Sequence, residues 1–102
     1  MNFGLKEKEL KYIKEVTTKF TEVEEVIIFG SRAMGNQKVS SDIDIAVKGK
    51  YIPHEIVLKI VDILNEDSPL PYFFDVINYN NIENPELKKH IDEKGITIYK
   101  KM

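Results

Sequence analysis

Residues 42 to 47 read Asp-Ile-Asp-Ile-Ala-Val, and this alternation of charged and apolar side chains constrains the fold more than any other stretch of the chain. Successive side chains of a β-strand point to opposite faces of its sheet, so a period of two predicts a strand. Ile43, Ile45 and Val47 would face a core. Asp42 and Asp44 would then leave the other face together, as a pair of neighbouring carboxylates.

A glycine-containing turn comes shortly before this strand. The apolar run from Val26 to Phe29 predicts a buried strand that ends at Gly30. Glycine allows close backbone approach or a positive φ, and Ser31 adds a hydroxyl and an amide. A short helix is expected from Arg32 to Met34, and a helix N-terminus favours anions. We therefore expect Gly30 and Ser31 to hold the phosphates of a nucleoside triphosphate.

Arg32 has two open interpretations, since its guanidinium can reach a phosphate or stay on the helix surface. A Walker A loop is excluded. Gly30 and Gly35 have the required spacing, but Asn36 and Gln37 stand where Lys and Ser or Thr are needed.

Two carboxylates held this close repel each other, which raises one pKa unless a divalent cation lies between them. Oxygen ligands suit Mg²⁺, with Mn²⁺ as the other choice. A third carboxylate is available at Asp75, within the apolar run from Pro71 to Ile77. A charge at the centre of such a strand needs a reason. Asp75 is either a further metal ligand or an acid at the edge of a sheet.

Six positions of this region resemble the signature of the polymerase-β-like nucleotidyltransferase superfamily: Gly30, Ser31, Gly35, Ser41, Asp42 and Asp44. The short chain and the form Gly-Ser-Arg-Ala-x-Gly resemble its minimal nucleotidyltransferase (MNT) branch. The resemblance implies metal and catalytic roles for Asp42, Asp44 and Asp75. It also implies ATP as co-substrate and two Mg²⁺ ions.

The rest of the chain is consistent with one α/β domain spanning residues 1–102, because 102 residues allow one modest core. Helical periodicity predicts helices near residues 5 to 20 and from Pro53 to before Ser68. Asn84 and Pro85 begin a third helix that Gly95 ends. A last strand follows from Ile96 to Tyr99. The predicted order is α-β-(short α)-β-α-β-α-β, with a mixed sheet.

Net charge and composition limit the partners, the compartment and the metal sites that the sequence allows. A net charge of −2, with lysines and acids spread along the chain, argues against direct nucleic acid binding. Cysteine is absent, which removes disulfides and thiol catalysis. The first residues do not resemble a signal peptide and no apolar run is long enough to span a membrane, so we expect a cytoplasmic protein. His54 and His90 are expected at the surface or at helix caps, since neither has a partner at zinc-ligand spacing.

The resemblance further implies a function. Minimal nucleotidyltransferases are commonly paired with a helical HEPN protein, and they act as antitoxins that add AMP to a tyrosine of that partner. Two other functions remain open: a subunit that neutralises its partner by occlusion alone, and a small-molecule nucleotidyltransferase of the antibiotic-modifying kind whose acceptor pocket a homodimer would build. The oligomeric state stays open between homo-oligomer and hetero-oligomer.

Overall fold

The computed structural model describes residues 5–30, 42–67 and 69–101. The elements follow in the order α1 (Glu7–Thr18), β1 (Glu25–Phe29), β2 (Ile43–Lys48), α2 (His54–Asp62), a π-helical turn (Ile63–Asp67), β3 (Phe74–Asn78), a 3₁₀ turn (Tyr79–Asn81), α3 (Pro85–Lys94) and β4 (Ile96–Lys100). No helix formed by these residues is long and apolar enough to cross a membrane.

The four strands form one mixed sheet in the order β3-β2-β1-β4. β1 pairs antiparallel with both β2 and β4, whereas β2 and β3 are parallel. β2 is therefore an interior strand, and β3 lies at an edge. The mixed sheet expected from the sequence is confirmed.

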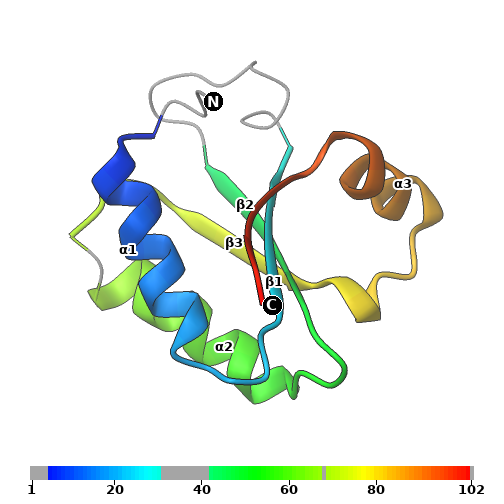
Figure 1. The fold of residues 1–102 in the computed structure, drawn as a ribbon, viewed down its shortest axis with the longest axis horizontal. Helices are drawn as coiled ribbons and strands as arrows, with labels where there is room; N and C mark the ends of the chain where they lie inside the picture. The colour runs from blue at the N-terminus through cyan, green and yellow to red at the C-terminus, as the bar shows by residue number, and fades with distance from the viewer. Residues whose placement is uncertain (1–4, 31–41, 68, 102) are drawn as a thin grey trace.

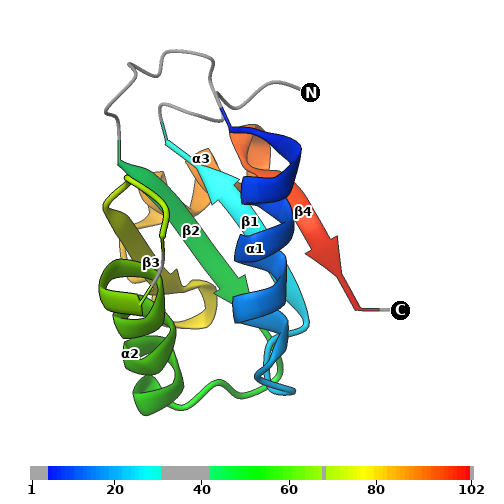
Figure 2. The ribbon, with the colours of Figure 1, turned by 90° about the vertical axis from the view of Figure 1, so that its left-hand side faces the viewer.

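Helices cover both faces of the sheet (Figures 1 and 2). α1 and α2 pack on one face, where their aliphatic side chains join Ile43, Ile45 and Val47 of β2 in the main core. α3 packs on the other face, where Ile91 meets Ile27, Phe29 and Ala46 in a smaller core. The three aliphatic side chains of β2 are fully buried, as the alternation predicts, so Asp44 must face the α3 side.

Local sequence signals place most element ends correctly. Asn84 caps α3, since its side-chain oxygen accepts hydrogen bonds from the amides of Glu86 and Leu87 at 2.9 and 3.4 Å. Gly95 follows the last residue of α3, as expected. The short helix predicted at Arg32 to Met34 lies outside the described residues.

Two expectations were inexact. α2 ends at Asp62, and the residues from Ile63 to Asp67, expected in the same α-helix before Ser68, form a π-helical turn. The third strand begins at Phe74, not at Pro71. Pro71 has no amide hydrogen to donate to a strand ladder, which is consistent with the later start.

The side chain of Asn65, in the π-helical turn, holds the outer edge of β3 through two hydrogen bonds. Its side-chain oxygen accepts a hydrogen bond from the Phe74 amide at 2.7 Å, and its amide donates to the Phe74 carbonyl at 2.9 Å. The amide of Asn65 thus takes the place of a neighbouring strand at the start of β3, one residue before Asp75. Pairing an edge in this way also limits its association with other chains.

We expect Asn65→Ala to lower the free energy of unfolding by about 1–3 kcal/mol, because two backbone groups lose their partners. Urea unfolding monitored by circular dichroism measures this. Glu66→Ala, in the same turn and exposed, is the matched control and should change little. Equal stability of Asn65→Ala and the parent chain would contradict the pairing role.

Candidate active site

Asp44 occupies the centre of the candidate site. It lies opposite Phe29 of β1 in the antiparallel pair and opposite Asp75 of β3 in the parallel pair. Residues opposite each other on neighbouring strands share a face of the sheet, so both carboxylates lie on the α3 side. Asp42 directly precedes β2. The structure therefore brings together the three acids that the sequence singled out.

The environment of Asp44 is unfavourable for a charged carboxylate. Burial raises the pKa of Asp44, and the negative charges of Asp75 and then Asp42 raise it further. A positive charge on His90 would lower it. Asp42 and Asp75 are exposed, whereas Asp44 is half-buried. Like charges gathered in this way favour binding of a cation.

The side chains of this cluster have the chemistry of a magnesium site. Three carboxylates offer the oxygen donors that Mg²⁺ prefers, and burial together with the negative charges of Asp75 and Asp42 raises the pKa of Asp44. Across residues 5–30, 42–67 and 69–101, however, no group of three or more histidine, cysteine, aspartate or glutamate side chains could hold a metal ion as placed. The residues fit Mg²⁺ by donor type and charge, and binding would require the carboxylates to converge.

Gly30 lies against this cluster for a specific steric reason. It has a φ of 77°, in the left-handed region that favours glycine. A Cβ built on Gly30 would overlap the Oδ2 atom of Asp44. Gly30 therefore lets the end of β1 pass directly beside the central carboxylate.

His90 is the residue of this region that the sequence did not reveal. The Gly30 amide donates a hydrogen bond to its Nε2 atom at 3.0 Å, and its ring packs edge-on against Phe29 with centroids 6.2 Å apart. His90 is half-buried at the site, so the expectation of a surface or cap role was wrong. Its position on α3 brings it to β1 only through tertiary packing. His54 is exposed at the start of α2, as expected.

Phe73 adds an exposed aromatic side chain beside the acids. It is two residues before Asp75 and 60% exposed, and its carbonyl accepts a hydrogen bond from the Ile43 amide at 2.9 Å. Phe73 directly precedes β3 and its carbonyl still pairs with β2, so an extended backbone at this point would put its side chain on the same face as that of Asp75. The other predicted phosphate-binding residues, Ser31 and Arg32, lie outside the described residues.

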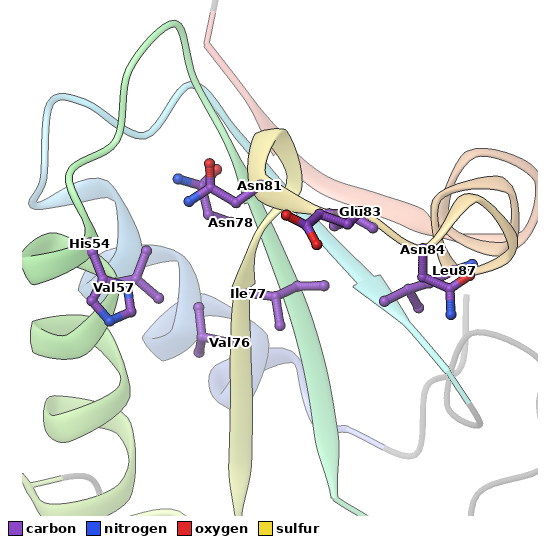
Figure 3. A pocket seen from close by; sticks show the side chains of 10 residues that line it. His54, Val57, Val76, Ile77, Asn78, Asn81, Glu83, Asn84 and Leu87 are labelled. Atoms are coloured by element: carbon purple, nitrogen blue, oxygen red, sulfur yellow. Dashed lines mark hydrogen bonds between the residues drawn. The ribbon is translucent and has the colours of Figure 1, made fainter.

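A separate cavity of about 390 Å³ lies beside the second half of β3. Figure 3 shows His54 and Val57 of α2 on one side of Val76 and Ile77, with Leu87 of α3 on the other. None of the three acids lines this cavity, nor does Gly30 or His90. We therefore place the candidate site at the acids and not in this cavity.

The four-stranded mixed sheet places neighbouring acids beside a glycine at a strand end, as the nucleotidyltransferase resemblance predicts. Residues 11–102 match the family described as "Polymerase beta, Nucleotidyltransferase". The chain belongs to this family, which confirms the predicted fold class and reaction class and indicates a nucleotide substrate.

Two proteins of Methanocaldococcus jannaschii, both named as proposed protein adenylyltransferases, are similar in sequence. One is 38% identical over 89 residues, covering 86% of this chain and 88% of the relative. The other is 37% identical over 99 residues, covering 89% and 99%. Both alignments therefore cover most of this chain and most of each relative.

Solved structures share the fold. A toxin–antitoxin crystal structure with AMP-PNP has a TM-score of 0.73 at 20% identity, covering 96% of this chain and 76% of that one. A complex of a tri-AMPylated Shewanella oneidensis HEPN toxin with its MNT antitoxin gives 0.67 at 17% identity, covering 89% and 69%. At these identities the likeness concerns the fold.

We expect Asp44→Asn to raise the melting temperature slightly at pH 7 without divalent cations. Folding raises the pKa of Asp44, so the folded state favours the protonated carboxyl. The stability that this carboxyl adds at low pH is lost as the pH rises through its folded-state pKa. At pH 7 the charged carboxylate is therefore unfavourable in the folded state, and asparagine removes that charge. The difference from the parent chain should vanish near pH 4, about the ordinary pKa of aspartate. Thermal unfolding followed from pH 4 to pH 8 measures it.

Asp62→Asn, which changes an exposed aspartate of α2, is the control and should show no such trend. A lower melting temperature of Asp44→Asn at pH 7 would mean that the carboxylate makes a stabilising contact.

Proposed function

We propose that this chain transfers AMP from ATP to a hydroxyl group of a helical HEPN-type partner protein. The observation that carries the proposal is the pairing of Asp44 with Asp75 on parallel neighbouring strands, with Gly30 against Asp44. This arrangement presents two acids and a strand-end turn on one open face. The names of the two sequence relatives support a protein as acceptor.

In the proposed reaction, Asp42, Asp44 and Asp75 would hold Mg²⁺ beside the triphosphate. The metal would neutralise the charge that develops on the phosphates. Gly30 and Ser31 hold the triphosphate, and Arg32 can add a charged contact to it.

Asp75 has a second role in proton transfer. It is exposed, so an acceptor hydroxyl can approach its carboxylate. The hydroxyl oxygen forms a bond to the α-phosphorus of ATP as the bond to the pyrophosphate oxygen breaks. Asp75 accepts the hydroxyl proton, and pyrophosphate leaves. Asp75→Asn should therefore reduce turnover more than nucleotide binding.

The test is to incubate the chain with ATP, Mg²⁺ and the proposed HEPN-type partner, followed by mass spectrometry of both chains. We expect one or more AMP adducts on the partner, and we expect Asp42→Asn and Asp75→Asn to abolish them. A partner that is bound but never modified would favour neutralisation by occlusion. Transfer to an added sugar or aminoglycoside in place of the partner would favour a small-molecule transferase.

Phe73 gives a second prediction, on acceptor recognition. An exposed aromatic beside Asp75 is suited to contact the acceptor, because burying it on binding removes apolar surface from water. Phe73→Ser should lower kcat/KM for the protein acceptor about tenfold or more, measured by AMP incorporation, while the melting temperature rise with ATP and Mg²⁺ stays unchanged.

Leu58→Ser is the matched control, because Leu58 is also exposed, at 54%, but lies on α2, away from the acids. A loss of activity equal for both variants would indicate a general effect on stability or association. An unchanged rate for Phe73→Ser would remove Phe73 from the acceptor site.

A further inference from the structure

The contact between α3 and the end of β1 joins two residues 60 positions apart in the sequence. The Gly30 amide donates to Nε2 of His90 at 3.0 Å, and Phe29 meets the same imidazole edge-on. α3 therefore does more than cover the smaller core, since it also supplies a polar contact at the edge of the proposed nucleotide site.

The direction of this hydrogen bond fixes the protonation of the ring. A backbone amide can only donate, so Nε2 must offer its lone pair. The imidazole is therefore neutral, with its proton on Nδ1. This tautomer follows from the geometry of the contact.

The hydrogen bond acts on the glycine that the site depends on. Gly30 has a φ of 77° and lies with its Cα against the Asp44 carboxylate. Holding its amide fixes the peptide plane that leads into this left-handed residue. It thereby fixes the backbone surface against which the Asp44 carboxylate packs.

We infer that His90 is a positioning residue of the nucleotide site: it holds Gly30 in the conformation that orients Asp44 and begins the phosphate-binding turn. This role rests on the proposed function, because it concerns binding of ATP with Mg²⁺. His90 acts through Gly30 and takes no part in proton transfer to or from the substrate.

Two substitutions separate the hydrogen bond from simple packing. His90→Phe keeps a ring against Phe29 but removes the acceptor, whereas His90→Gln supplies an acceptor oxygen. His54→Phe is the control, because His54 is the other of the two histidines and lies exposed on α2. The probe is AMP-PNP with Mg²⁺, titrated by calorimetry, with KM and kcat for ATP measured on the partner complex.

We expect His90→Phe to weaken AMP-PNP binding and to raise the KM for ATP about tenfold, the factor that corresponds to one lost hydrogen bond, with a smaller change in kcat. His90→Gln should recover much of the loss, and His54→Phe should bind as the parent chain does. Unchanged affinity in a folded His90→Phe would overturn the role. The role would also be overturned if both His90 variants lost the same affinity for AMP-PNP and that loss followed the fall in their melting temperatures without nucleotide.

Nitrogen-15 NMR of the parent chain at neutral pH tests the contact independently of nucleotide. We expect an unprotonated Nε2 on His90, and a protonated Nε2 would overturn the hydrogen bond itself. A parent chain that binds no AMP-PNP would overturn the proposed function and the positioning role with it, even where NMR confirms the contact.

Discussion

The packing of β2 is the constraint on which the rest of the site depends. Ile43 and Ile45 are fully buried against α1 and α2, so β2 cannot rotate or slip by one residue without exposing them and burying its acids. This burial turns Asp44 toward α3, where it lies between the last residue of β1 and the start of β3. The closeness of Asp44 to Gly30 and to Asp75 follows from this single choice of face.

The free energy of aliphatic burial thus maintains an electrostatic arrangement that is unfavourable by itself. Asp44 is partly removed from water and lies near two further acids, which is why its pKa is raised. A chain of this size has a modest core with which to offset such a cost. Sites that concentrate like charge commonly reduce stability in exchange for function, and the cluster on β2 and β3 has this character.

The two faces of the sheet have different roles. α1 and α2 complete the main core, whereas α3 covers part of the opposite face and leaves Asp75 and Phe73 exposed at the β3 edge. That edge is held at Phe74 by the side chain of Asn65, so the strand carrying Asp75 is fixed from the α2 side. The layer of α1 and α2 therefore supports the strands that carry the acids, and the opposite face of the sheet leaves the acids accessible to substrates.

The sequence by itself determined the strands, the caps of α3 and the choice of Asp42, Asp44 and Asp75, because alternation, Asn-Pro caps and charges within apolar runs are local signals. It also indicated Gly30. It did not show that the Asp44 carboxylate lies where a Cβ at this position would be, which is why glycine is needed there. His90 and Asn65 had no signal, since a single histidine or asparagine on a helix looks like any surface residue. Their partners, Gly30 and Phe74, are brought to them only by packing of helices on the sheet, and such contacts between distant segments are decided by the tertiary structure.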